Sequence, residues 1–248
     1  MKFSVYQRSE QSGRKNNEDR VGYVYTQESA LFVVADGMGG HANGELAAQI
    51  SLESVTELFE KQAHPLLADP REFLSEAFMQ AHHQILQFSH EQGMDDTPRT
   101  TLTVLVIQDG KATWAHCGDT RLYWLRATQL LKRTLDHSYA EQMPAGVTTK
   151  NSDYLTKMAN RNVLFTCLGS PAKPIYDISP TVKMLPGDKF FISSDGLWGC
   201  VSEQEIVDAL ASSVPVTHSV PRLIDLALKN GGIYGDNVTG IGVEWKGN

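Results

Sequence analysis

The feature that most constrains this chain is a set of four aspartates, each beside a glycine or an asparagine at an end of an apolar run. They are Asp36, Asp119, Asp195 and Asp236. A β-branched and aromatic run that stops at Asp-Gly, as it does at Asp36 and Asp195, is typical of a strand that delivers a carboxylate into a tight turn. One such turn is ordinary. Four of them, distributed over most of the chain, indicate a site built from carboxylates.

Carboxylate oxygens are the ligands that hard divalent cations prefer, so the four aspartates indicate a site for Mg²⁺ or Mn²⁺. The sequence has no Cys/His cluster that would offer a softer alternative. Its three cysteines, Cys117, Cys167 and Cys200, lie in apolar neighbourhoods and form no Cys-x-x-Cys motif. We therefore expect buried structural thiols in a protein of a reducing compartment.

Composition narrows the class of protein further. A chain of 248 residues with 41% hydrophobic content is long enough for one large core, so we expect a single domain over 1–248. The net charge of −7, with no Lys/Arg run longer than a dipeptide, argues against nucleic acid as a partner. The start of the chain lacks an apolar signal core, and no apolar stretch approaches the length of a membrane span. These features predict a soluble cytoplasmic protein without a membrane partner.

The hydrophobic pattern predicts clustered strands and paired helices. Strands are expected at 3–7, 21–26, 30–35, 101–108, 112–117, 122–126, 129–132, 163–167, 178–184, 189–193 and 240–245. Helices are expected at 44–61, 71–92, 203–212 and 218–229, the third capped by Ser202, with a short one near 152–159 in the polar stretch 138–162. Because no βαβ alternation runs through the chain, the pattern predicts the α+β class: an antiparallel β-sandwich of two sheets with helix pairs on both outer faces.

Seven short motifs follow one another along the chain. They are Gly13-Arg-Lys-Asn-Asn-Glu-Asp-Arg20, Val34-Ala-Asp-Gly-Met-Gly-Gly-His41 with Gly44-Glu45, Thr100-Thr-Leu102, Gly118-Asp-Thr-Arg121, Asp136-His-Ser138, Ser194-Asp-Gly-Leu-Trp198 and Asp236-Asn237. In this order they resemble the motifs of the type 2C metal-dependent serine/threonine protein phosphatases, and the chain looks like a bacterial single-domain member. The resemblance covers nearly the whole chain. It implies a helix-flanked β-sandwich, a binuclear Mg²⁺/Mn²⁺ centre between the sheets, and a flap at about 138–162.

The resemblance also implies the metal ligands. Asp36 matches the aspartate that bridges two ions, and the backbone carbonyl of Gly37 matches a ligand of one of them. Asp195 and Asp236 match ligands of the other ion. A water or hydroxide held between the ions would attack the phosphorus, since two divalent ions both acidify a bridging water and hold phosphoryl oxygens.

Asp119 has two interpretations. Bacterial members of the family often hold a third, weaker ion, and Asp119 together with Asp195 matches that site. The alternative is an Asx-turn that closes the hairpin at Gly118. The Gly-Asp-Thr-Arg motif favours the metal. Arg121, two residues later, is expected to pair with a carboxylate as a structural group.

Arg14 matches the residue that clamps the substrate phosphate, because a guanidinium can hold two phosphoryl oxygens in a bidentate fork. Position alone would make it one more exposed arginine in a polar stretch. Glu18, Asp19 and Asn237 are expected around the ligands, with Glu18 as an acceptor for metal-bound water. A solvated turn is an equal alternative for Glu18.

Two positions depart from the family pattern. Many animal members have a histidine, proposed there as the general acid, where this chain has Met38. His41 lies nearby and could reach the substrate as a catalytic group, or could equally cap the helix that begins near Gly44. Arg99 stands where the family usually has glycine, which is expected to alter the approach to the next strand more than the chemistry.

The resulting hypothesis is an Mg²⁺/Mn²⁺-dependent protein serine/threonine phosphatase, a phosphoric monoester hydrolase that acts on phosphoprotein substrates. It would be a monomer that opposes a Hanks-type kinase. A phosphatase or phosphodiesterase of small phosphoesters could use the same binuclear site. A pseudophosphatase that binds phosphoproteins without turnover is a further alternative, although no metal carboxylate is missing.

Overall fold

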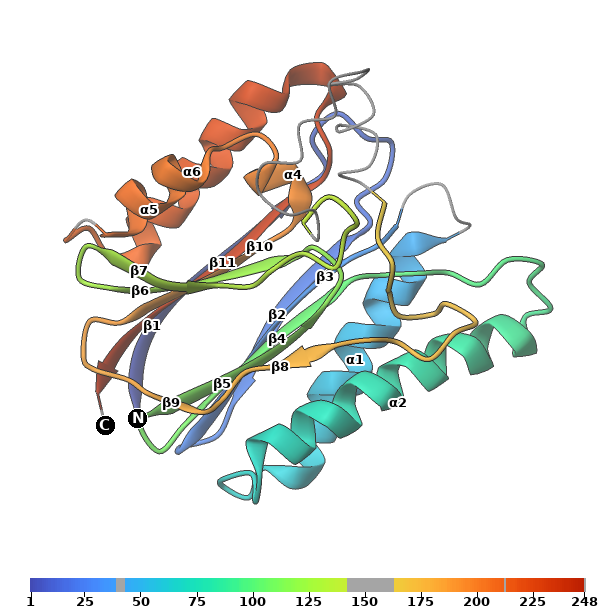
Figure 1. Ribbon diagram of the computed structural model, residues 1–248, viewed down its shortest axis with the longest axis horizontal. Helices are drawn as coiled ribbons and strands as arrows, with labels where there is room; N and C mark the ends of the chain where they lie inside the picture. Colours follow the sequence, from blue (N-terminus) through green and yellow to red (C-terminus); the bar gives the residue numbers. More distant parts are fainter. Residues whose placement is uncertain (39–42, 142–162, 212, 248) are drawn as a thin grey trace.

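The computed structural model describes residues 1–38, 43–141, 163–211 and 213–247. Two sheets pack face to face, and each carries helices on its outer face (Figure 1). The first sheet has the strand order β1-β11-β10-β6-β7, and the second has the order β2-β3-β4-β5-β8, with β9 also paired to β5. All of these strand pairs are antiparallel. The predicted fold class is confirmed.

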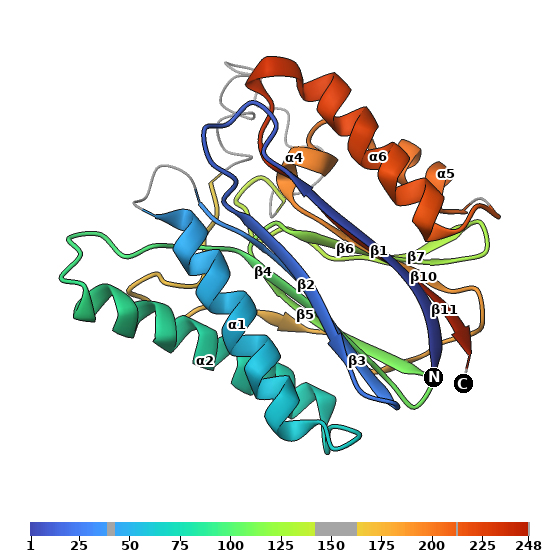
Figure 2. The same ribbon diagram turned by 180° about the vertical axis from the view of Figure 1, so that it is seen from behind.

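The strands of the first sheet are β1 (Lys2–Glu10), β6 (Arg121–Arg126), β7 (Gln129–Arg133), β10 (Lys189–Ser193) and β11 (Val238–Gly247). Those of the second are β2 (Asp19–Tyr25), β3 (Ser29–Asp36), β4 (Leu102–Gln108), β5 (Lys111–Cys117), β8 (Asp177–Ile178) and β9 (Val182–Lys183). The first and last strands pair along their whole length, from Lys2 opposite Gly247 to Glu10 opposite Val238. The two ends of the chain therefore lie side by side (Figures 1 and 2).

β3 shows why the apolar runs form strands buried on both faces. Its alternate residues enter different cores: Leu31, Val33 and Ala35 join the cluster under α1 and α2, and Ala30, Phe32 and Val34 join the cluster between the sheets. Successive side chains of a strand point to opposite faces, so a strand with apolar layers on both sides needs a continuous apolar run. The run ends at Asp36, where the strand reaches the edge of the core.

Two helix pairs complete the layers. α1 (Gly44–Gln62) and α2 (Pro70–Glu91) cover the second sheet, while α5 (Glu203–Ala211) and α6 (Val216–Gly231) cover the first (Figures 1 and 2). α5 begins with a capping box: Glu205 N donates to Ser202 Oγ at 3.3 Å, and Ser202 N donates to the Glu205 carboxylate at 2.9 Å. The prediction that Ser202 caps this helix is confirmed.

Three predicted elements differ from the structure or fall outside it. The expected strand at 163–167 is wrong: the segment makes one isolated bridge, between Leu164 and Ser138, and Thr166 Oγ1 accepts from Ile175 N at 2.8 Å. The expected strand at 178–184 is split into β8 and β9 around Pro180, which has no N–H to donate. The helix expected near 152–159 lies outside the described residues, as does most of the expected flap.

Candidate active site

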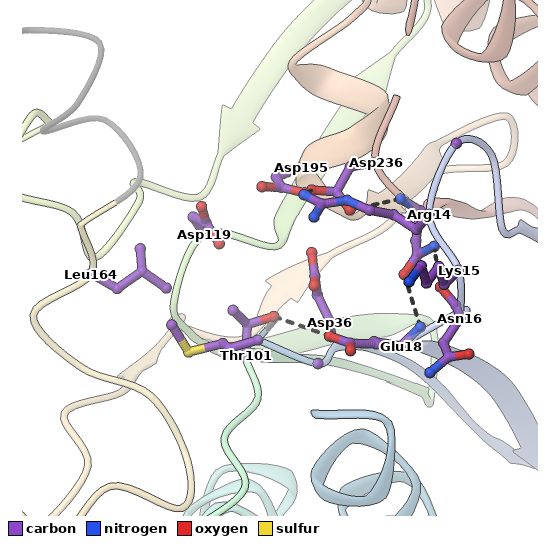
Figure 3. Close-up of a pocket in the computed structure, with 14 residues that line it drawn as sticks. Arg14, Lys15, Asn16, Glu18, Asp36, Thr101, Asp119, Leu164, Asp195 and Asp236 are labelled. Carbon is purple, nitrogen blue, oxygen red and sulfur yellow. Dashed lines mark hydrogen bonds and ion pairs between the residues drawn. The ribbon is translucent and has the colours of Figure 1, made fainter. Parts of the chain in front are cut away.

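The four aspartates of the sequence motifs meet in one pocket of about 540 Å³ at one end of the sandwich (Figure 3). Asp36 is the last residue of β3, and Asp119 follows β5. Asp195 opens the short helix α4 (Asp195–Trp198) directly after β10, and Asp236 precedes β11. Two of the four therefore come from each sheet. The sequence pattern did not predict α4.

The backbone around Asp36 is fixed by two threonines. Its carbonyl oxygen accepts from Thr101 N at 2.9 Å and from Thr100 Oγ1 at 2.8 Å, and its N–H donates to Thr101 Oγ1 at 3.3 Å. These bonds leave the carboxylate to point toward Asp195 and Asp236 (Figure 3). Thr101 also lines the pocket, a position that the threonine motif marked without indicating its role.

Glycines allow several backbone segments to approach one another closely at this end of the sandwich. A Cβ at Gly37 would collide with the backbone of Gly44 and with the Glu18 carbonyl, and a Cβ at Gly196 would collide with the Asn237 carbonyl. These contacts bring the turn after β3 against the loop before β2, and the start of α4 against the start of β11. Glycine is the residue that permits such close backbone approach.

Asp119 is held in place by its neighbours on both sides. Gly118 has φ +100, a conformation that favours glycine, and its N–H donates to His137 Nδ1 at 3.2 Å. The Asp119 carbonyl accepts from Trp198 Nε1 at 3.0 Å. The carboxylate lines the pocket (Figure 3).

Arg121 has the structural role expected of it. Its Nε and Nη2 donate to the two carboxylate oxygens of Asp136 at 2.8 and 2.7 Å, and its guanidinium lies 3.6 Å above the Trp198 ring. The prediction that Arg121 pairs with a carboxylate is confirmed. The pair ties the start of β6 to the segment that leads toward 138–162.

Burial and mutual repulsion dominate the electrostatics of the pocket. Burial, followed by the charges of Asp19, Asp195 and Asp119, raises the pKa of Asp36 well above its ordinary value. Burial, followed by the charge of Asp195, raises the pKa of Asp119 in the same way. Burial and Asp236 raise the pKa of Asp195 to about 6. Such carboxylates resist losing their protons unless a cation is brought among them.

The donor set fits hard divalent cations. The carboxylates of Asp36, Asp119, Asp195 and Asp236 line one pocket, and in its described lining the cationic side chains are those of Arg14 and Lys15. Asp19 Oδ1 is buried and has no hydrogen-bond partner among the described residues. Oxygen-rich sites with unbalanced negative charge are those that Mg²⁺ and Mn²⁺ prefer.

The residues expected around the ligands form a polar layer beneath them. Asp19 lies opposite Asp36 in the β2–β3 register, and its Oδ2 accepts from Ser194 Oγ at 2.7 Å. Burial raises the pKa of Asp19 to about 7. Glu18 is half-buried in the pocket lining, and burial together with the charge of Glu45 raises its pKa.

Asn237 closes the loop that carries Arg14. Its Oδ1 accepts from Glu18 N at 2.8 Å, and its Nδ2 donates to the carbonyls of Gln11 and Asn16 at 2.8 and 2.9 Å. Arg14 Nη2 lies 2.5 Å from Asp236 Oδ2, and its side chain is 55% exposed at the pocket. One buried amide therefore fixes both ends of the loop between β1 and β2.

Replacing Asn237 with alanine is expected to lower kcat/KM for a phosphothreonine peptide, the substrate that the motif resemblance implies, by about 10- to 100-fold. The reason is that the Arg14 loop loses three anchoring bonds. Steady-state kinetics would measure this. Asn230→Ala is a matched control, since the Asn230 amide donates to Cys200 O on the surface and lies outside the pocket lining. Equal kinetics in the two variants would contradict the anchoring role.

Other predicted positions are placed as follows. Met38 lines the pocket, and its N–H donates to the Arg99 carbonyl at 2.9 Å. The Arg99 side chain instead lies 3.3 Å from Asp96, away from the pocket lining. His41 lies outside the described residues. Sequence reasoning gave no role to Lys15, Asn16 or Leu164, which also line the pocket.

Comparison with known proteins decides the family. The model of the family described as protein phosphatase 2C matches residues 7–226. The chain belongs to the protein phosphatase 2C family. This membership confirms the predicted enzyme class, protein serine/threonine phosphatase.

Named phosphatase 2C relatives match along most of the chain. The protein phosphatase PhpP of Streptococcus pneumoniae serotype 2 is 30% identical over 231 residues, which are 91% of this chain and 90% of PhpP. The catalytic domain of the serine/threonine phosphatase PstP, solved with two manganese ions, is 27% identical with a TM-score of 0.75 over 98% of this chain and 97% of that one. PppA, described as a regulatory component of T6SS in Pseudomonas aeruginosa, is 26% identical with a TM-score of 0.75 over the same shares.

Within the described ranges of this phosphatase, no helix has the length and apolar character needed to cross a membrane.

Proposed function

We propose that this protein is an Mn²⁺- or Mg²⁺-dependent phosphatase that removes phosphate from phosphoserine and phosphothreonine in protein substrates. The observation that carries the proposal is the group of carboxylates, from both sheets, that line one pocket with Arg14. The names of the relatives support the substrate class, and the manganese ions of PstP support the cofactor.

The residues that would hold the ions are Asp36, Asp195 and Asp236, with the Gly37 carbonyl, and Asp119 for a third ion. When bound, divalent ions supply positive charge for phosphoryl oxygens and an activated water nucleophile. In the described lining of the pocket, carboxylates outnumber the two cationic side chains, Arg14 and Lys15, so the carboxylates would hold such ions through their excess negative charge.

Arg14 is the side chain with which the protein itself would bind the substrate phosphate. Its guanidinium has five N–H donors, and the ion pair with Asp236 uses Nη2. The Asn237 bonds keep this loop at the pocket, so the guanidinium is positioned before the phosphate arrives. Met38 carries no proton to donate, so this position does not provide the general acid.

The proposal also includes a monomer in the cytoplasm, one catalytic domain over 1–248, and a Hanks-type kinase as the opposing enzyme. The free cysteines among the described residues, Cys117, Cys167 and Cys200, support a reducing compartment. His41 as a catalytic group and 138–162 as a flap stay predictions.

The experiment is release of phosphate from a phosphothreonine peptide by purified protein in EDTA, Mg²⁺ and Mn²⁺, with p-nitrophenyl phosphate in parallel. We expect no turnover in EDTA, and turnover of the peptide once Mn²⁺ is restored. A folded protein that hydrolyses only p-nitrophenyl phosphate would support a small-phosphoester enzyme instead. Inactivity with every ion and substrate would support a phosphoprotein-binding protein without turnover.

A further inference from the structure

Two adjacent apolar side chains stand out on the surface near the active site. Ile233 and Tyr234 are 78% and 90% exposed, more than any other large hydrophobic residue in the described parts of the chain. They form the short helix η1 (Gly232–Tyr234), which links α6 to Asp236. Gly232, at φ +59, ends α6 and begins this turn.

The turn is fixed beside the loop that carries Arg14. Gly13 N donates to Gly235 O at 3.1 Å. A Cβ at Gly13 would collide with the Ile233 carbonyl, and one at Gly235 would come within 2.6 Å of Ser12 Oγ. Both ribbon views place the β1–β2 loop beside the end of α6 (Figures 1 and 2). The backbone of the turn with Ile233 and Tyr234 therefore packs with little room to move against Gly13, which lines the pocket, and this places the turn at the rim.

Single exposed apolar residues are common on protein surfaces and need no explanation. This pair differs because it is contiguous, lies next to a strongly charged pocket, and is held by backbone packing rather than by its own side chains. Tyrosine is enriched where proteins bind one another, since its large ring buries much area while only two side-chain torsions are fixed. Exposed residues beside the pocket lining are placed to contact a protein substrate that enters the pocket.

We propose that Ile233 and Tyr234 bind an apolar side chain of the phosphoprotein substrate, close in sequence to the phosphorylated residue. The inference rests on the proposed function and adds a determinant of substrate choice. Tyr234 is two residues from Asp236, which contacts Arg14. Since an extended peptide advances about 3.3 Å per residue, a substrate phosphate at Arg14 would bring side chains within about three positions to this rim.

The test compares two phosphothreonine peptides, one with leucine and one with glycine at the positions flanking the phosphoresidue. Wild-type protein is expected to prefer the leucine peptide in kcat/KM. Tyr234→Ala is expected to reduce that preference by about tenfold, as truncation of a contact residue commonly does. Tyr234→Phe keeps the ring and is expected to keep the preference. Tyr25→Ala is the matched control, because Tyr25 is 61% exposed at the far end of β2.

Two results would overturn the inference alone. One is an unchanged peptide preference in Tyr234→Ala while wild-type protein hydrolyses both peptides. The other is an equal fall for both peptides and for p-nitrophenyl phosphate, which would show that the substitution disturbs the Arg14 loop. Wild-type protein that hydrolyses p-nitrophenyl phosphate but neither peptide would contradict the proposed function, and the inference with it.

Discussion

Replacing Asp36 with asparagine is expected to lower kcat for a phosphothreonine peptide by about a thousandfold or more, at saturating Mn²⁺. Asp36 lies at the centre of the carboxylate group, and the charges of Asp19, Asp195 and Asp119 all act on it. Asparagine keeps the shape of the side chain but replaces two charged oxygens with one neutral oxygen and an NH₂ group. The site would then lose the ligand that the family resemblance places between the ions.

The matched control is Asp109→Asn. Asp109 lies in the exposed hairpin turn between β4 and β5, pairs with Lys111 at 2.7 Å, and has φ +51, which asparagine tolerates. This variant is expected to keep wild-type kinetics. Both variants should show the same circular dichroism spectrum as wild-type protein. Comparable activity in Asp36→Asn and Asp109→Asn would rule out a metal-binding role for Asp36.

Without divalent ions, the folded protein is expected to become less stable as pH rises from about 6.5 to 8. Burial raises the pKa of Asp19 to about 7 and holds the pKa values of Asp36 and Asp119 well above their ordinary value. The folded state therefore binds more protons than the unfolded state in this window. The stability that these raised pKa values contribute is fully present below the pKa of an aspartate in the unfolded chain. It is lost as pH rises through the pKa values of the three aspartates in the folded protein. The loss should be on the order of 3 kcal/mol, or ~10 °C in Tm.

At lower pH, buried histidines have the opposite effect on the stability of the folded protein. Burial lowers the pKa of His116 to about 4, so protonation of His116 favours the unfolded state below about pH 6.5. This contribution fades over about one pH unit above 6.5, so the carboxylates account for the slope in the upper part of the window.

Thermal denaturation in EDTA at several pH values would measure the effect. Asp36→Asn should show a shallower slope and a higher Tm than wild-type protein near pH 8, since it removes one charge from the cluster. Asp109→Asn should follow wild-type protein. Mn²⁺ should raise the Tm of wild-type protein most at high pH, because an ion that binds only the folded state stabilises it. A wild-type Tm in EDTA that is flat or rises with pH would contradict the electrostatic account.

Local patterns were sufficient to predict most of the fold. The continuous apolar run of β3 indicates a strand whose alternate residues enter two cores. Ser202 and Glu205 mark the start of α5 as a capping box. The errors arose where one local bond or one missing donor outweighed the pattern. The Thr166 side chain bonds to the Ile175 backbone in a segment with a single isolated bridge, and Pro180 interrupts a strand that its apolar neighbours favour.

The site was predictable in its residue types more than in its contacts. The aspartates are recognisable because each lies at an end of an apolar run, and antiparallel strands bring such ends together. Asn237 anchors the Arg14 loop across more than 200 positions of sequence. Its bond to Gln11, for example, spans 226 positions. The packing of Gly13 against Ile233 has the same long range. No local pattern carries such information, because these contacts depend on how β1 pairs with β11.

The pairing of the first strand with the last also sets the order in which the pocket can be completed. During synthesis, β1 leaves the ribosome first, but its partner β11 and the neighbouring Asp236 and Asn237 emerge only near the end of the described chain. Until then the Arg14 loop lacks its bonds to Asn237 and Asp236, and one of the carboxylates of the pocket is absent. We therefore expect the nascent chain not to dephosphorylate proteins until its last strand has joined the sheet.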